Sequence, residues 1–443
     1  MTETRLIDSC TGWIDRARAD IARDREWLFA HPELGYKERE TAAYLAKRLR
    51  GIEPCPAIQE GLGITGIKAT IPCGNPQGIH VGLLCELDAV TSPLHPSADP
   101  VSGAAHACGH SFQMTVMLAA FEALLRSGAC RELCGSISFF AVPAEEYIEL
   151  AYRLELRRQG KIRYLSGKQE LLSLGAFDEV DMLLMCHAHP DSEPGEVFLE
   201  GGSLGFLAKT VCFLGKTAHA GAAPHLGVNA LNAATAAIMG MHMNRETFRD
   251  EEHVRIHPIL TKGGDVVNSV PAEAVMETYV RSSNLNAMRD AAAKVDRSVR
   301  GGCVMVGASA EIETLPGYLP LRQDTALTAV FERALERTQG FSRAVRGVDM
   351  PGSSDIGDLS HLLPVIQPTV GGFSGSLHGS DFAELKGDFV AALTAKAMAS
   401  AVVMLLADGA ARGRHIREAF RPILTKEAYL NYLDGCFTHE WVE

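Results

Sequence analysis

Apolar residues at the start of the chain recur at the spacing of an α-helix. Residues 7–49 follow this pattern, which His31-Pro32 interrupts, so we expect helices on both sides of that proline. Further along, residues 114–125 have a helical pattern, and short apolar runs predict strands over residues 64–71, 79–84, 137–142 and 182–186. Strands that alternate with helices are typical of an α/β fold, in which helices flank a mostly parallel central sheet.

The order of elements changes near Ser203. The pattern then predicts a strand, a helix, two strands, a helix and a strand, over residues 207–214, 226–242, 254–260, 274–280, 287–299 and 304–312. This βαββαβ order is that of a ferredoxin-like α+β unit. After Pro316-Gly317 the α/β character returns. We therefore expect a larger α/β domain, residues 1–203 and 318–443, interrupted by a smaller inserted domain, residues 204–317.

Residues 149–169 form an unusual segment between the end of a predicted strand and Leu171-Leu172. The segment is rich in Arg, Lys, Glu and Leu. Such a mixture of charges is typical of a solvated helix whose side chains pair with one another. A helical insertion at the rim of an active site is the alternative interpretation.

Composition and charge exclude several classes of protein. Of the 443 residues, 47% are apolar and 22% are charged, which is ordinary for a globular protein. The net charge of -12 argues against a nucleic-acid partner, which would require a basic face. We expect no membrane segment, because no window holds 18 uninterrupted apolar residues. We expect no signal peptide, because the charged start of the chain has no apolar run before a small-residue cleavage site. Eleven scattered cysteines indicate free thiols and a cytoplasmic location.

Four short clusters of possible metal ligands lie at predicted strand ends or in loops, where open α/β sheets carry their function. They are His106-Ala107-Cys108-Gly109-His110, Pro143-Ala144-Glu145-Glu146, Cys186-His187-Ala188-His189 and Leu377-His378-Gly379. Imidazole, carboxylate and thiolate together suit zinc, manganese and other divalent metals. His187 and His189 would share one face of a strand, so either could be the ligand.

Two adjacent carboxylates in the second cluster allow a division of labour. The side chains of Glu145 and Glu146 diverge, so one can bind metal while the other moves protons to and from water. Metal coordination lowers the pKa of bound water towards about 7, and two metals about 3.5 to 4 Å apart can share that water. The clusters therefore predict metal-assisted hydrolysis.

The chain resembles the M20 metallopeptidases, and in particular their amidohydrolase subfamily, which includes aminoacylase-like, indoleacetyl-amino-acid hydrolase-like and aminobenzoyl-glutamate hydrolase-like enzymes. The resemblance extends from His31 to about Ala407. Its motifs are Glu86-Leu87-Asp88-Ala89, HACGH at 106–110, PAEE at 143–146, GKTAHAG at 215–221, NSVP at 268–271 and the loop of His378.

The resemblance implies that residues 1–203 and 318–443 are a catalytic metal-binding domain and that residues 204–317 are a lid and dimerisation domain. It also implies a role for each matching residue of the catalytic domain. The implied ligands of two divalent metal ions, manganese or zinc, are Cys108, His110, Glu146, His187 and His378. Cys108 is the implied bridge, because a thiolate has several lone pairs and two cations keep it deprotonated. Glu145 is the implied general base, and Asp88 the carboxylate that supports the site.

In the inserted domain, the resemblance implies three further site residues and a homodimer. His219 would reach the active site of a partner subunit, where it would stabilise the oxyanion, with Asn268 as a polar contact nearby. Arg281 would clamp a substrate carboxylate. The alternatives are that His219 caps the helix that follows it and that Arg281 is a surface residue in a salt bridge.

Three departures from the family pattern bear on the substrate. Ser111 and Gln113 replace an Asp and a His after HACGH, and Ser354 stands where a Glu is common. They place the chain nearer to the aminobenzoyl-glutamate hydrolase-like and dipeptidase-like branches. We therefore predict a hydrolase of a small N-acyl or N-aroyl amino acid that carries a carboxylate. A dipeptidase or carboxypeptidase is the second hypothesis, and a binding protein with a vestigial metal site the third.

Overall fold

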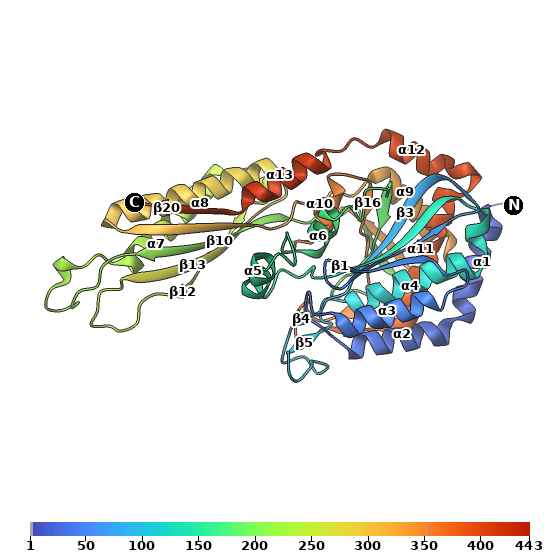
Figure 1. The fold of residues 1–443 in the computed structure, drawn as a ribbon, viewed down its shortest axis with the longest axis horizontal. Helices are drawn as coiled ribbons and strands as arrows, with labels where there is room; N and C mark the ends of the chain where they lie inside the picture. Colours follow the sequence, from blue (N-terminus) through green and yellow to red (C-terminus); the bar gives the residue numbers. More distant parts are fainter. Residues whose placement is uncertain (1–2, 351) are drawn as a thin grey trace. The chain divides into compact units, whose positions relative to one another are not determined.

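The structure, a computed structural model, describes residues 3–350 and 352–443, which form two compact units (Figure 1). The first unit contains residues 3–202, Arg322–Asp349 and Leu359–Ile423. The second contains Ser203–Leu321, residues 350 and 352–358, and Leu424–Glu443. Residues 318–321, residues 350 and 352–358, and Leu424–Glu443 differ from the expected division, which placed residues 318–443 wholly in the catalytic domain.

A six-stranded sheet forms the centre of the first unit, in the order β1-β2-β6-β3-β7-β16. Its strands are β1 (Ala57–Leu62), β2 (Gly66–Pro72), β3 (Asn75–Glu86), β6 (Cys134–Val142), β7 (Met182–Leu184) and β16 (Val365–Ile366). The four strands from β6 to β16 run parallel, whereas β2 is antiparallel to both of its neighbours. The predicted α/β fold with a mostly parallel sheet is therefore confirmed.

Long helices pack against this sheet or against one another. They are α1 (Glu3–Arg16), α2 (Arg18–Ala30), α3 (Arg39–Arg50), α4 (His110–Arg126), α9 (Thr325–Arg337) and α11 (Gly387–Leu406). Both α4 and α11 contact β3 and each other, and α1 and α2 pack on this pair. The end of α2 at Ala30 agrees with the helix break predicted at His31-Pro32, since the residue before a proline avoids the helical conformation.

Helix α11 is the one helix in the described part of the chain that is long and apolar enough to cross a membrane. However, 89% of its apolar window is buried inside the protein. Its neighbours include α4 and α9, whose apolar faces cover it. The helix therefore belongs to the hydrophobic core of the first unit.

Shorter elements connect these strands and helices. They are β4 (Val90–Thr91), β5 (Ala104–Ala105), α5 (Leu150–Arg158), α6 (Gly167–Ser173), β8 (His187–Ala188), β9 (Glu196–Leu199), β15 (Arg343–Arg346), α10 (Ile356–Ser360), β17 (Thr369–Val370), β18 (Phe373–Ser374), β19 (Ala383–Glu384) and α12 (Ala411–Ala419). Of these, β15, β9, β17 and β8 form a separate small sheet.

The second unit is an antiparallel sheet with two helices side by side on one face (Figure 1). Its elements are β10 (Gly205–Leu214), α7 (Ala230–Met243), β11 (Arg255–Ile256), β12 (Ile259–Lys262), β13 (Glu273–Ser282), α8 (Leu285–Val306) and β14 (Ser309–Pro316). The predicted βαββαβ order is confirmed, with the strand predicted over residues 254–260 divided into the two short strands β11 and β12. The strand predicted from residue 304 begins later, because α8 continues to Val306 and ends at Gly307, whose φ of 73° stops the helix.

The carboxyl-terminal segment adds α13 (Lys426–Cys436) and β20 (Thr438–Val442) to this unit. Strand β20 pairs with β14, so that Thr438 lies opposite Thr314. A local pattern cannot reveal a pairing between strands so distant in sequence. This pairing is why the second unit includes residues that sequence analysis assigned to the catalytic domain.

The core position of α11 leads to a stability prediction. Leu405 is fully buried and Leu94 is 84% exposed. Leu405→Ala should lower the free energy of unfolding by about 2–5 kcal/mol, because the cavity left behind is only partly refilled. Leu94→Ala, the same substitution at an exposed position, should change that free energy by less than about 0.5 kcal/mol. Chemical denaturation measures both values, and equal losses would contradict the core assignment.

Candidate metal centre

The candidate ligands meet because parallel strands end at a common edge of the sheet. Strand β3 ends at Glu86 and is followed by Asp88, and its neighbour β6 leads into Glu145 and Glu146. Strand β7, on the other side of β3, leads to His187. The side chains that follow these carboxyl ends therefore converge, as expected for an open α/β sheet.

The loop of Cys108 adds a thiolate and an imidazole to this edge. Gly109 has a φ of 84°, and a Cβ there would lie 2.6 Å from the Cβ of Ala188, so only glycine fits. This tight turn starts α4 at His110 and brings the Cys108 Sγ to 3.6 Å from the His187 Nε2. One ligand atom from each of Cys108, His110 and His187 lies within 4.8 Å of the other two.

Cys108 also belongs to a second group of possible ligands. Cys108, Glu146 and His378 offer ligand atoms within 4.8 Å of one another. The His378 Nε2 lies 3.0 Å from the Glu146 Oε1, and the backbone N–H of His378 donates to the carbonyl of Ala107 at 2.7 Å. The structure thus brings together all five predicted ligands, in two groups that have Cys108 in common.

Hydrogen bonds fix which nitrogen each buried imidazole offers. His110 Nδ1 donates to the carbonyl of Asp88 at 2.8 Å, and His187 Nδ1 donates to the carbonyl of Ala188 at 2.9 Å. A carbonyl only accepts, so Nδ1 carries the proton and Nε2 faces the cluster in both rings. The Asp88 carboxylate accepts the backbone N–H of Glu146 at 2.9 Å and so helps to hold Glu146 in place.

His189 points away from the cluster. Its Nδ1 lies 2.9 Å from the Thr369 Oγ1, and its ring stacks on Phe198 with centroids 3.6 Å apart. Sequence analysis left His187 and His189 as alternatives. The structure places His187, and not His189, beside Cys108.

The electrostatics of the cluster suit cations. Burial and Glu146 raise the pKa of the Cys108 thiol, but His110 and His187 outweigh them and lower it to about 6. Burial also raises the pKa of Glu146, yet His378 and His110 bring it to about 2. In the described part of the chain, the His110 Nε2 and the Glu146 Oε1 are buried without a hydrogen bond of suitable geometry. A cation bound to each of these two atoms would take the place of the missing hydrogen bond.

Glu86 also belongs to the site, although sequence analysis did not single it out as a site residue. Glu86, His110 and Glu145 form a third group of possible ligands, in which the Glu86 Oε2 lies 3.1 Å from the His110 Nε2. Gln113, one of the departures from the family pattern, donates to the Glu86 carboxylate at 3.1 Å and to the carbonyl of Cys186 at 2.7 Å. The signal available in the sequence was an acidic residue at the end of a buried strand.

The charged segment 149–169 is only in part a solvated helix: Arg158 and Glu155 of α5 form an exposed ion pair, but other charges of the segment are buried. It contains α5 and the start of α6, and its Arg153 and Lys168 are among the largest fully buried side chains. Lys168 Nζ donates to the Glu86 Oε1 at 2.5 Å. The interpretation as a solvated helix fails for these two cations because both are buried, and Lys168 pairs with Glu86, 82 residues away in the sequence, which a local charge pattern does not show.

His219 and Asn268 lie side by side in the second unit. The backbone N–H of Ala220 donates to the carbonyl of Asn268 at 2.9 Å, and both predicted residues are exposed. His219 Nδ1 accepts the N–H groups of Gly221 and Ala222 at 3.2 and 3.1 Å. The ring therefore caps the turn that follows, while its Nε2 carries the proton in the neutral form.

Arg281, on β13 of the same unit, is half-buried and has no salt bridge within the described residues. Its guanidinium lies 5.2 Å from the ring centre of Phe206 and 5.3 Å from that of Tyr279, and it donates to the Ser353 Oγ at 2.6 Å. Burial lowers the pKa of Arg281. A cation held between aromatic rings, with no acidic partner, is available to an anionic ligand.

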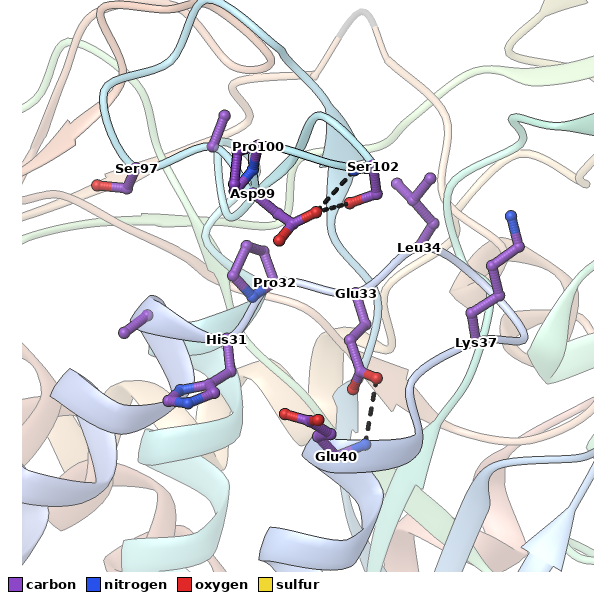
Figure 2. A pocket seen from close by; sticks show the side chains of 12 residues that line it. His31, Pro32, Glu33, Leu34, Lys37, Glu40, Ser97, Asp99, Pro100 and Ser102 are labelled. Carbon is purple, nitrogen blue, oxygen red and sulfur yellow. Dashed lines mark hydrogen bonds between the residues drawn. The ribbon is translucent and has the colours of Figure 1, made fainter.

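A separate cavity of about 430 Å³ opens in the first unit (Figure 2). Its lining includes His31, Glu33, Lys37, Glu40 and Asp99. The Glu33 carboxylate accepts the backbone N–H groups at the start of α3, and Asp99 accepts those of Val101 and Ser102. These two carboxylates therefore bind nearby backbone N–H groups. None of the five predicted metal ligands lines the cavity.

An open α/β sheet that carries thiolate, imidazole and carboxylate side chains at its strand ends defines a candidate metallohydrolase. The chain belongs to peptidase family M20/M25/M40, whose model matches residues 82–382. This match covers more than half of the chain and confirms the predicted resemblance. The protein is therefore a hydrolase of amide or peptide bonds.

Relatives with assigned names act on different substrates. The Xaa-Arg dipeptidase of Mus musculus is 27% identical over 94% of this chain and 93% of its own length. The N-acetylcysteine deacetylase of Bacillus subtilis is 26% identical over 77% of this chain and 85% of its own length. One of the p-aminobenzoyl-glutamate hydrolase subunits of Escherichia coli is 25% identical over 72% of this chain and 71% of its own length.

Solved structures share the fold. A putative aminohydrolase from methicillin-resistant Staphylococcus aureus has a TM-score of 0.75 at 21% identity, over 89% of this chain and 99% of its own. A Bacillus subtilis protein, described as a dinuclear metal binding peptidase from the M20 family, has a TM-score of 0.68 at 22% identity, over 88% and 99%. At these identities the likeness establishes the fold alone.

The lowered pKa of Cys108 leads to a test of the site's electrostatics. In protein stripped of metal by a chelator, iodoacetamide should alkylate Cys108 readily at pH 7–8, and the rate should fall as the pH drops through about 6. The reason is that the thiolate, and not the thiol, is the nucleophile. Cys186 is the control, because burial raises the pKa of its thiol. Peptide mass spectrometry measures both rates, and equal labelling at pH 7 would contradict this account.

Proposed function

We propose that this hydrolase cleaves the amide bond of a small N-acyl or N-aroyl amino acid, with two divalent cations held by Cys108, His110, Glu146, His187 and His378. The observation that carries the proposal is the place of Cys108 in both groups of three ligand atoms. A thiolate in that position can bind two cations at once. Manganese and zinc both accept such a mixture of ligands.

Each group supplies a different set of ligands beside the shared thiolate. His110 and His187 would hold one cation through their Nε2 atoms, and Glu146 and His378 would hold the other. When bound, the cations supply Lewis acidity, which polarises an amide carbonyl and makes water more acidic. The buried His110 Nε2 and Glu146 Oε1, which lack well-formed hydrogen bonds among the described residues, support this assignment.

Glu145 is the proposed general base. Its carboxylate is only 5% exposed, and its Oε2 lies 3.9 Å from the His110 Nε2, at the edge of the ligand cluster. From there Glu145 takes a proton from the attacking water and later delivers it to the leaving nitrogen. The neighbouring Glu146 is directed towards His378 instead, so the two carboxylates divide the work.

The second unit supplies substrate contacts in this proposal. Arg281 has a guanidinium without an acidic partner among the described residues, which suits a substrate carboxylate. The neutral His219 ring would donate its Nε2–H to the oxyanion that forms at the carbonyl, because its Nδ1 is already occupied by backbone donors. Asn268 lies beside His219 and offers a further polar contact.

A dipeptidase is the second candidate function. The observation that favours it is the mouse Xaa-Arg dipeptidase, which aligns along 94% of this chain. Both candidates cut an amide next to a carboxylate-bearing amino acid. A panel of N-acetyl amino acids, p-aminobenzoyl-glutamate and dipeptides ending in Arg, each assayed with added Mn²⁺ or Zn²⁺, would separate them.

Glu145→Gln gives the most direct test of the mechanism. The variant should bind as many cations per chain as the wild type, because Glu145 is not a proposed ligand. Its kcat should fall by at least about 100-fold, because proton transfer loses its acceptor. Elemental analysis and steady-state kinetics on the same preparations measure the two effects. A turnover close to that of the wild type would refute the role of Glu145.

We also propose that the protein is a homodimer through its second unit. Strand β12 lies at an edge of the sheet and pairs only with β13 among the described strands (Figure 1). Its Ile259 and Leu260 are 59% and 41% exposed. An apolar edge strand without a second neighbour favours pairing with another chain. A dimer would also allow His219 to serve the active site of its partner.

Ile259→Lys should weaken this dimer, because a charged residue on an edge strand opposes pairing. Sedimentation velocity over a range of concentrations should show a dimer for the wild type and a shift towards monomer for the variant. Turnover per chain should fall as the dimer dissociates, because His219 would no longer reach the active site of a partner subunit. Leu94→Lys, at an exposed position of the first unit, is the control. A fully active wild-type monomer would contradict the proposal.

A further inference from the structure

We propose that Arg153 is a positioning residue of the metal centre, which holds the turn that carries Glu145 and Glu146. The inference rests on the proposed function, because it assigns Arg153 a role towards the cations that Glu146 would bind. Arg153 lies on α5, within the segment 149–169 whose function neither the family pattern nor the charge pattern explains.

The contacts of Arg153 bracket the proposed general base. Its side chain is 1% exposed. Nη1 donates to the carbonyl of Ala144 at 3.2 Å and to that of Leu165 at 2.8 Å, and Nη2 donates to the carbonyl of Glu146. One rigid guanidinium therefore binds the peptide groups on both sides of the Glu145-Glu146 pair, which fixes the direction in which the two carboxylates leave the backbone.

The turn needs such support because its backbone is unusual. Ala144 has a φ of 52°, in the left-handed region that non-glycine residues seldom adopt. Its N–H donates to the buried Glu38 carboxylate at 2.8 Å, and its carbonyl also accepts the N–H of Gly167 at 3.3 Å. Backbone strain of this kind persists only where the surroundings hold it. Arg153 is the side chain that joins both ends of the turn.

The space around the Arg153 guanidinium is too small for an additional side chain. A Cβ on Gly35 would lie 2.5 Å from the Arg153 Nη2 and 2.9 Å from the Ala144 Cα, so a side chain there would displace the contact. Helix α5 is anchored at this place by an ion pair between Lys37 and Glu149, at 2.6 Å, and by apolar contacts with Tyr36. These contacts together hold Arg153 in one defined position.

The charge of Arg153 points to positioning and not to simple stabilisation. In the described part of the chain it has no carboxylate partner, and its hydrogen bonds go to backbone carbonyls. A buried cation without an ion-pair partner is costly to desolvate. The same segment reaches the site a second time through Lys168, whose Nζ contacts the buried Glu86 carboxylate at 2.5 Å. Two buried cations from one segment therefore support the acidic side chains of the centre.

The loss of Arg153 should affect the two cation sites unequally. Glu146, which Arg153 holds through its carbonyl, belongs to the group with His378. His110 and His187, in the other group, are oriented by Asp88 and Ala188 instead. Removal of the guanidinium should therefore weaken the Glu146 site selectively. A residue that only stabilised the fold would weaken both sites or neither.

Titration of metal-free protein with Co²⁺ tests this inference. Competition with a chromophoric chelator gives the two affinities, and the absorption of cobalt thiolate reports binding at Cys108. Arg153→Met should weaken one of two sites by about 10- to 100-fold, the usual effect of losing a group that orients a metal ligand. Arg153→Lys should be intermediate, because an ammonium group lacks the planar fork. Gly35→Ala should weaken the same site by displacing the guanidinium, with Arg153 still present.

Arg158→Met is the matched control, since Arg158 lies on the same helix with a side chain that is 72% exposed. It should bind Co²⁺ as the wild type does. Thermal unfolding confirms that each variant is folded. Affinities within about threefold of the wild type in folded Arg153→Met and Gly35→Ala, or an equal loss at both sites, would overturn the inference. A wild type that binds two Co²⁺ but cleaves none of the amides would contradict the proposed substrate class, while a selective loss in Arg153→Met would still support the positioning role.

Discussion

The thiolate of Cys108 lies buried between imidazole rings and a carboxylate, and a negative charge in such a place requires positive charge beside it. In the metal-free protein, His110 and His187 meet this requirement and lower the pKa of the thiol. Against the effect of burial, Glu86 and then Cys108 raise the pKa of His110, and Cys108 raises the pKa of His187. Protons and divalent cations therefore compete for one set of atoms, and metal binding should release protons.

The fold brings these charged groups together at one edge of the central sheet. Three neighbouring parallel strands, β6, β3 and β7, end at the same edge, so residues far apart in the sequence bring candidate ligand atoms within 4.8 Å of each other. The same part of the first unit contains several buried polar residues, namely Glu38, Glu86, Asp88, Gln113, Arg153 and Lys168. Their hydrogen bonds hold the loops that carry the ligands. The segment 149–169 contributes two of these buried groups, Arg153 and Lys168, while Arg158 on the same helix is exposed.

Much of the site could be predicted from the sequence because its signals are local. HACGH, PAEE and His378 are recognisable by residue type and by their place at strand ends, and the structure brings these residues together. The contacts of Lys168 with Glu86 could not be predicted, because the partners are distant in sequence and a buried cation looks the same as a solvated one. The pairing of β20 with β14 was missed for the same reason. The choice between His187 and His189 required the neighbours of each ring.

X-ray absorption at the metal edge, on protein loaded with two equivalents of Zn²⁺, tests the central claim that Cys108 joins two cations. The account predicts a sulfur neighbour at about 2.3 Å from zinc and a second metal at about 3.5 to 4 Å. Both signals should disappear or weaken in Cys108→Ser. Two bound zinc ions with only nitrogen and oxygen neighbours, in a spectrum that Cys108→Ser leaves unchanged, would contradict the account.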